Sequence, residues 1–185
     1  MKKIMFNDKF LLTQAVLRGE KTQTRRIAKD GTPLGNFEET LKHSPYKVGE
    51  VVAVAQCYKR IYAEMIIDFA KHNYHLPRED AAEMFRKQYE NTAGWDNKMY
   101  VKAELMPHHI RILDVRLERL QSISEEDALK EGIYELAFDY YLPYRCENPF
   151  NMPRKAFAVL IDKVSGKGTW DSNPYVWVYD FELVK

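Results

Sequence analysis

Two long stretches in which apolar and polar residues alternate limit most strongly the folds open to this chain. Residues 110–117 alternate almost regularly, with Leu113 as the irregularity. Residues 175–184, which read YVWVYDFELV, form a second such stretch with one aliphatic face. Because every second side chain of a strand lies on the same face, both stretches are predicted to be strands with one covered face.

Shorter segments complete the pattern. Their aliphatic and β-branched residues predict further strands at 3–6, 21–27, 50–58 and 99–106. The 3.6-residue period predicts helices at 8–18, 124–131 and 154–165, and two more within 60–92. Strands and helices that are segregated along the chain favour an α+β fold over a doubly wound parallel sheet.

Start and stop signals support two of these helices. Asn7 or Asp8 is predicted to cap the helix at 8–18, and Gly19 stands where a helix-ending glycine is expected. Ser124 opens a capping-box pattern, and Gly132 is predicted to end that helix. Residues 28–49 carry several glycines and prolines and are expected to be loop.

The length of 185 residues predicts a single domain, residues 1–185, with a helical insert at about 60–92. Cys57 and Cys146 are isolated and have no CxxC spacing, which indicates reduced thiols and a cytoplasmic location. No apolar run approaches the roughly 18 residues of a membrane span, so no membrane partner is expected. No phosphate-binding glycine motif is present, and neither a cofactor nor a metal is expected.

Positive charge is concentrated near the N-terminus, although the net charge of the chain is only +1. Residues 1–29 contain eight Lys or Arg against two acidic residues, and RGEKTQTRRI at 18–27 holds four of the eight. A basic region on a nearly neutral protein suits an anionic ligand, and nucleic acid is one candidate. The alternative is an ordinary solvated loop.

Three blocks in order resemble the ASCH family of the PUA-like superfamily, in its phage and mobile-element type. They are AVLRGEKTQTRRI, then VRLERLQSISEEDALKEGI, then the C-terminal GTWDSNPYVWVYDFE, with PYKVGEVVAV between the first two. The resemblance implies a small, mostly antiparallel β-barrel with flanking helices. Members of the family are proposed to bind RNA or nucleotides, which would make RNA or a modified nucleoside the partner here.

The resemblance also implies candidate residues. Some small relatives are amidohydrolases that remove the acyl group of N4-acetylcytidine with a Lys, a Thr and a Glu. Carried over by motif, these are Lys21, Thr24 and Glu131, with Glu125 and Glu126 left open as alternatives to Glu131. For a binding protein, the ligand-binding residues would be Lys21, Thr22, Arg25, Arg26 and Trp170.

The chemistry of Lys21 can go either way. A lysine accepts a proton from a Thr hydroxyl only if its pKa falls well below its usual value of about 10, through burial or neighbouring cations. A preceding helix C-terminus opposes this because it favours the protonated amine. Arg25 and Arg26 lie on opposite faces of a strand, and we expect them to be exposed charges whose removal barely alters stability.

Three functions therefore stay open from the sequence. The first is a protein that binds RNA or a nucleotide through the basic loop. The second is an amidohydrolase acting on N-acylated pyrimidine nucleosides. The third is a protein-interaction module that uses the helical insert. Phage-type relatives usually have a VRETW strand after a Gly-Asp turn. The same place reads VAQCY here, with Ala55, Gln56 and Tyr58 for the Arg, the acid and the Trp, so any role of that strand is not carried over.

Overall fold

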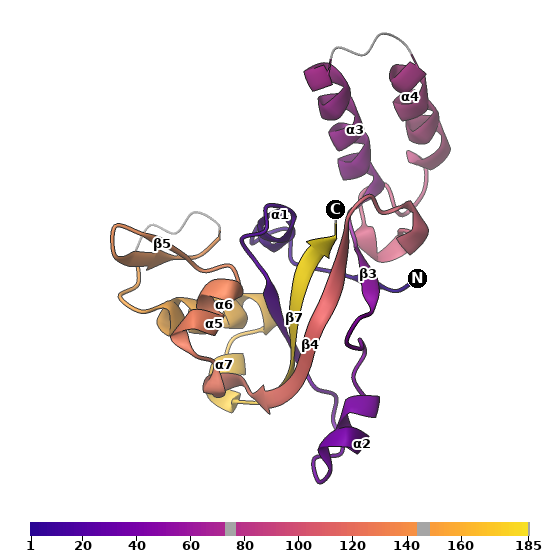
Figure 1. Cartoon of the computed structure of the whole chain (residues 1–185). Helices are drawn as coiled ribbons and strands as arrows, with labels where there is room; N and C mark the ends of the chain where they lie inside the picture. Colours follow the sequence, from indigo (N-terminus) through magenta and orange to yellow (C-terminus); the bar gives the residue numbers. More distant parts are fainter. Residues whose placement is uncertain (73–76, 144–148, 185) are drawn as a thin grey trace. The chain divides into compact units, whose positions relative to one another are not determined.

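The computed structural model describes residues 1–72, 77–143 and 149–184. The chain divides into two compact units, which are described one at a time. Unit 1 comprises Met1–Phe6 and Val52–His109, and unit 2 comprises Asn7–Val51 and Ile110–Lys185. Each unit is therefore built from two separate segments of the chain, and Figure 1 follows these segments by colour.

Unit 2 contains the two long strands predicted from alternation. They are β4 (His109–Arg119) and β7 (Tyr175–Val184), and β7 pairs on its other side with β2 (Gln23–Ile27). The β2–β7 pairing is antiparallel and sets Gln23 opposite Asp180 and Thr24 opposite Tyr179. Directly opposed residues share a face, so this register decides which side chains meet around β2.

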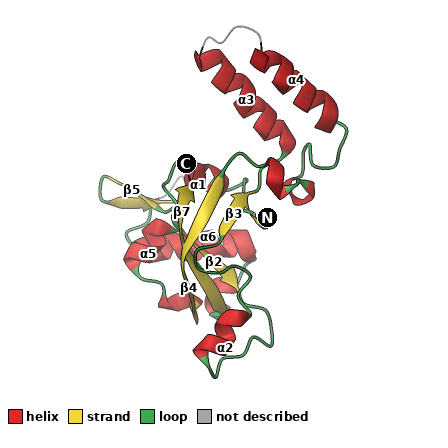
Figure 2. Cartoon of the chain, turned by 45° about the vertical axis from the view of Figure 1, so that its right-hand side comes forward, coloured by secondary structure: helices red, strands yellow, loops and turns green. Residues whose placement is uncertain are grey.

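The helices of unit 2 are short except for one. They are α1 (Leu12–Leu17), α2 (Phe37–Lys42), α5 (Glu125–Lys130), α6 (Pro153–Ser165) and α7 (Thr169–Ser172), with a 3₁₀ turn at Leu120–Ser122. Figure 2 shows α5 beside α6, and the buried side of α6 includes Phe157 and Leu160. The apolar stripe of α6 thus supplies core beside the β2–β7 sheet.

Several boundaries differ from the sequence predictions. The first helix begins at Leu12 and not near Asp8, because Leu11 adopts a left-handed conformation and no side chain caps the helix. Instead, the Thr13 hydroxyl donates to the Asp8 carboxylate. The predicted loop at 28–49 contains α2, which Asn36 caps by accepting from two backbone N–H groups. Local turn chemistry explains both differences.

The segment after α5 forms a small hairpin. Strands β5 (Tyr134–Leu136) and β6 (Asp139–Tyr141) pair antiparallel, with Ala137 and Phe138 at positive φ in the turn. Tyr134 and Tyr141 stack at 5.5 Å between ring centroids across it. Cys146 lies outside the described residues, whereas Cys57 is a free thiol.

Unit 1 holds the two helices expected within 60–92, α3 (Tyr58–His72) and α4 (Pro77–Tyr89), which run side by side in Figure 1. Short strands β1 (Lys3–Ile4) and β3 (Val51–Val54) pair in parallel. The stretch 99–106, predicted as a strand, instead forms 3₁₀ turns at Lys98–Tyr100 and Ala103–Leu105. Lys3 Nζ donates to the carbonyl oxygens of Met99 and Val101, which ties these turns to β1.

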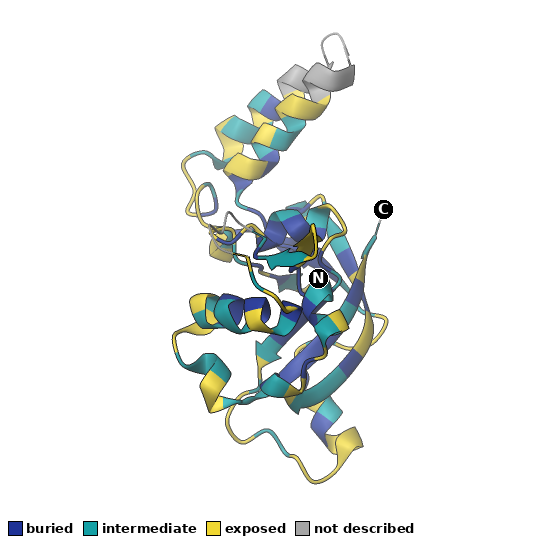
Figure 3. Ribbon diagram, turned by 90° about the vertical axis from the view of Figure 1, so that its left-hand side faces the viewer, coloured by how far each residue is buried: buried dark blue, intermediate teal, exposed yellow. Residues whose placement is uncertain are grey.

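The core of unit 1 lies at the base of the helix pair. Tyr58 packs edge-on against Phe85 at 5.8 Å and tilts against Tyr89 at 4.6 Å between ring centroids. Met106 and Ile61 belong to the same buried cluster. Above this core, the described residues of the two helices are a mixture of exposed, intermediate and buried positions (Figure 3). The described aromatic core of unit 1 therefore holds the two helices together at this base.

The α+β class is confirmed, because the described chain combines several helices with strands that pair both parallel and antiparallel. A closed β-barrel, and a single domain with an insert, stay predictions. Across the described ranges, no helix combines the length and the apolar character that crossing a membrane requires.

Candidate functional site

Lys21 lies at the centre of a buried polar cluster in unit 2. The residue is 2% exposed, and its ammonium has three acceptors. Lys21 Nζ donates to the backbone carbonyl of Gln23 at 2.7 Å, to the backbone carbonyl of Glu131 at 2.9 Å and to Glu131 Oε2 at 2.5 Å. All three N–H bonds of the ammonium are therefore used within the protein.

Two glycines let the chain deliver Lys21 and Glu131 to this position. Gly19 ends α1 at φ +74°, and the Lys21 backbone N–H then donates to the carbonyl of Ala15 at 3.1 Å. Glu131 caps the C-terminus of α5, and Gly132 follows at φ +100°, a conformation that only glycine adopts readily. The predicted start of α5 is also confirmed, since the Ser124 hydroxyl accepts from the Asp127 backbone N–H.

Arg25 is the second cation of the cluster, and its side chain has no exposed surface. Its guanidinium lies 3.1 Å from Glu131 Oε1, 3.1 Å from Asp127 Oδ2 and 3.7 Å from Glu118 Oε2. One face of the group lies over the Phe157 ring at 5.9 Å. The expectation that Arg25 and Arg26 are exposed charges is therefore wrong: Arg25 is buried among carboxylates and Arg26 is half-buried. A role of either residue in ligand binding stays a prediction.

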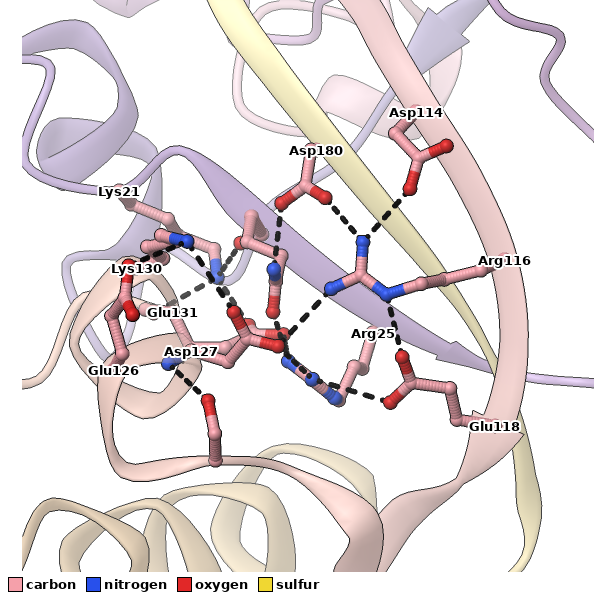
Figure 4. Close-up of polar contacts among 12 residues, drawn as sticks. Lys21, Arg25, Asp114, Arg116, Glu118, Glu126, Asp127, Lys130, Glu131 and Asp180 are labelled. Carbon is pink, nitrogen blue, oxygen red and sulfur yellow. Dashed lines mark hydrogen bonds and ion pairs between the residues drawn. The ribbon is translucent and has the colours of Figure 1, made fainter.

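A closed ring of hydrogen bonds and ion pairs extends from Arg25. Arg25 donates to the Gln23 side-chain carbonyl, and Gln23 Nε2 donates to Asp180 Oδ1 at 2.6 Å. Asp180 pairs with Arg116, and Arg116 reaches Asp127 Oδ2 at 3.1 Å, which returns to Arg25. Figure 4 shows this ring, with Arg116 entering from β4. Side chains from four elements thus fix one another.

These surroundings change proton affinities. Burial lowers the pKa of Lys21 from its usual 10.5, and the attraction of Glu131 opposes this without cancelling it. The charges of Arg26 and Arg25 lower the Lys21 pKa further. Burial by itself would raise the pKa of Asp127, yet hydrogen bonds from Gln23 and Arg25 outweigh burial and hold it below 3.8. Lys21 is thus shifted in the direction that a general base requires.

The opposite face of β2 carries Thr24 and Arg26. By register Thr24 shares its face with Tyr179, whose hydroxyl forms a 2.9 Å hydrogen bond with Ser44 Oγ. Tyr46 packs edge-on against Tyr179 at 5.3 Å. Burial raises the pKa of Tyr179 to about 12 and lowers that of Arg26, against the attraction of Tyr46.

Thr24 is 4% exposed, and its hydroxyl makes no hydrogen bond to another residue of the described ranges. Thr22 is half-buried and is held through its backbone, with its N–H donating to the Lys130 carbonyl at 2.9 Å. Trp170 is half-buried in α7 and meets Phe157 edge-on at 6.2 Å. Phe157 thus lies between Trp170 and Arg25 of the cluster.

The structure also separates the three glutamates left open by the sequence. Glu131 contacts Lys21 and is 4% exposed. Glu125 accepts from the backbone N–H of Arg154 at 2.9 Å, and Glu126 pairs with Lys130 at 3.1 Å. The motif-based choice of Glu131 as the partner of Lys21 thus agrees with the contacts, while its catalytic role stays a prediction.

Sequence reasoning missed the rest of the ring. Gln23 could have been found, because strand alternation places it on the same face as Arg25. Asp114, Arg116 and Glu118 stand at alternate positions of the predicted strand, which marks a charged face of β4. What the pattern does not contain is the order β4–β7–β2, which brings that face to Arg25.

In the described part of the chain, no group of three or more His, Cys, Asp or Glu has the arrangement of a metal site. Comparison with protein-family models, with curated proteins and with solved structures found no match to this chain. The residues of the cluster therefore carry the functional argument by their own geometry and chemistry.

Proposed function

We propose that this protein is an amidohydrolase of the ASCH type, with a PUA-like barrel, that removes the acyl group from the exocyclic nitrogen of pyrimidine nucleosides. The observation that carries the proposal is the 2.5 Å contact between Lys21 Nζ and Glu131 Oε2. These residues are far apart in the sequence, and the resemblance named both for catalysis. The substrate class rests on that resemblance.

The electrostatics of Lys21 support a role in proton transfer. Burial lowers the pKa of Lys21, so the neutral amine forms at a lower pH than in water. Glu131 lies within hydrogen-bond distance and can exchange a proton with the amine. Functional sites commonly combine burial with one specific charged partner in this way.

Thr24 would be the nucleophile. Its oxygen attacks the acyl carbon, and because Thr24 and Lys21 lie on opposite faces of β2, its proton would reach Lys21 through a bridging water. The bond from the acyl carbon to the exocyclic nitrogen then breaks. The nitrogen leaves as a free amine after it takes up a proton from the Lys21–Glu131 pair. Water hydrolyses the resulting ester, which releases the carboxylic acid and restores the hydroxyl. Because the Thr24 hydroxyl has no partner within the described residues, no internal hydrogen bond must break first.

The phosphate-binding alternative has less support at Lys21 and Arg25. Both cations are buried and already paired with carboxylates, so a phosphate would have to displace Glu131 or Asp127. Arg18, the first cation of the basic stretch, pairs with Glu20 at 2.7 Å. Contacts that neutralise phosphates normally come from cations accessible to solvent.

The proposal is tested with purified protein and N4-acetylcytidine, by following both binding and the release of acetate. Lys21→Met, Thr24→Val and Glu131→Gln should each lower turnover by at least about a hundredfold. The double variant Lys21→Met/Thr24→Val should lose little more turnover than either single variant. Arg18→Met is the matched control and should keep the wild-type rate. Salt-dependent binding of short RNAs without turnover of any N-acylated pyrimidine nucleoside would instead assign the protein as a nucleic-acid binder.

A further inference from the structure

The Glu131 carboxylate is shared by two buried cations. Its Oε2 lies 2.5 Å from Lys21 Nζ, and its Oε1 lies 3.1 Å from the nearest Arg25 nitrogen. Figure 4 shows Arg25 on the side of Glu131 away from Lys21. A carboxylate that interacts with one cation only would hold the ammonium proton of Lys21 more strongly than a shared one does.

We propose that Arg25 is a positioning residue that takes a share of the Glu131 carboxylate and so weakens the hold of Glu131 on the Lys21 proton. The inference rests on the proposed function for its catalytic meaning, since it explains how a paired lysine can serve as a base. The effect acts through Glu131 and requires no contact between Arg25 and the substrate.

The position of Arg25 is fixed independently of Lys21, which the proposal requires. Asp127 at 3.1 Å and the side-chain carbonyl of Gln23 hold two of its nitrogens, and Phe157 lies over its face. Asp127 and Gln23 are held in turn by Arg116 and Asp180. Arg25 therefore stays beside Glu131 whether or not Lys21 carries a proton.

The charged and titratable groups around the Lys21–Glu131 pair come from each element that contributes to the cluster. They are Arg25 and Arg26 from β2, Asp127, Lys130 and Glu131 from or directly after α5, Asp114, Arg116 and Glu118 from β4, and Asp180 from β7. The Arg25 and Arg26 charges both lower the Lys21 pKa. Removing Arg25 therefore removes a repulsion from Lys21 and also strengthens its pairing with Glu131, and both changes favour the protonated amine.

The experiment is an NMR titration of protein labelled with ¹³C and ¹⁵N in lysine, in which Lys21→Met identifies the Lys21 signal. In Arg25→Met the Lys21 titration should move upward by about one pH unit. The ascending limb of the pH–rate profile should move by the same amount, which is about a tenfold loss of rate on that limb. Arg18→Met removes an exposed arginine of the same charge, and the Lys21 titration should not move.

Arg25→Lys covers the case in which Arg25→Met does not fold. The lysine ammonium is a compact charge without the planar fork that spans Glu131, Asp127 and Gln23, so an upward shift is again expected. A Lys21 titration that stays within about 0.3 pH unit of wild type in the folded Arg25 variants overturns the inference. Because the titration is read without substrate, a protein that turns over no nucleoside would contradict the proposed function and leave this result standing.

Discussion

The two faces of strand β2 hold their cations in different ways. On one face, Lys21 and Arg25 both contact the Glu131 carboxylate, at 2.5 and 3.1 Å. On the other face, Arg26 lies near the phenols of Tyr46 and Tyr179. Its charge also acts across the strand on Glu131 and Lys21. Burial raises the pKa of both tyrosines, so near neutral pH these phenols carry no charge.

This difference shows where proton transfer can occur around the strand. On the carboxylate face, charges of both signs are buried together, and a small change in one group alters the proton affinity of the next. On the phenol face, burial raises the pKa of Tyr46 and Tyr179, so both phenols stay neutral near neutral pH. Acid–base chemistry is therefore expected on the carboxylate face, and the following predictions test that contrast.

Glu131→Gln is expected to have the largest effect, a loss of about 3 to 5 kcal/mol of unfolding free energy at pH 7. The amide keeps the shape of the side chain but leaves Lys21 and Arg25 buried without the negative charge between them. Urea unfolding followed by circular dichroism measures the loss. A loss no larger than that of Tyr179→Phe would remove the contrast between the two faces.

Lys21→Met should cost about 2 kcal/mol near pH 7, because one oxygen of Glu131 loses its partner while Arg25 still holds the other. The lowered Lys21 pKa means that the unfolded chain binds more protons. The stability of wild type relative to Lys21→Met should therefore rise with pH until the unfolded value of 10.5 is reached. The expected rise would be contradicted if, between pH 7 and pH 10.5, the unfolding free energy of wild type decreased relative to that of the variant.

Tyr179→Phe should cost about 1 kcal/mol at neutral pH, through loss of the hydrogen bond with Ser44. Because the pKa of Tyr179 is raised from 10.0 to about 12, its contribution is complete below pH 10 and decreases as pH rises through 12. The carboxylate face therefore gains stability up to about pH 10.5, whereas the phenol face loses it from about pH 10 upward. Thermal unfolding of wild type and variant across this range would show whether the two trends oppose each other.

Arg18→Met is expected to have the smallest effect, below about 0.5 kcal/mol. Arg18 and Glu20 form an ion pair at 2.7 Å, but both side chains are more than half exposed to solvent. The same measurement by urea unfolding provides the baseline for the buried cations. If Arg18→Met lost as much unfolding free energy as Lys21→Met, burial would not be what distinguishes Lys21 from Arg18.

More of the candidate site than of the residues around it could be predicted from the sequence. Alternation located β4 and β7, and helix-end signals located α5 with Ser124 and Gly132, because these features are local. The motif placed Lys21 and Glu131 in one site before their contact was known. The burial of Arg25 was predicted wrongly, because its carboxylate partners come from α5 and β4, and no local pattern specifies that meeting.

Secondary structure was predicted wrongly where a short segment can form its backbone hydrogen bonds in more than one conformation. The stretch 99–106 has strand-like composition, yet Lys3 binds the carbonyls of Met99 and Val101 from a distant part of the chain and the segment forms 3₁₀ turns. The helix at Leu12 begins late because Leu11 adopts a left-handed conformation. Both outcomes depend on contacts that period and propensity do not contain.

Gly132 has no side-chain functional group, yet substitutions at this position should impair function as strongly as substitutions of the charged residues in the site. Its φ of +100° turns the chain directly after Glu131, so that both the carbonyl and the carboxylate of Glu131 reach Lys21. A Cβ at this position would meet only ordinary contacts, with Lys21 Cβ at 3.6 Å, so the backbone conformation and not crowding excludes other residues. In a mutational scan scored for function, Gly132 should therefore tolerate substitution as poorly as the charged residues that it brings together.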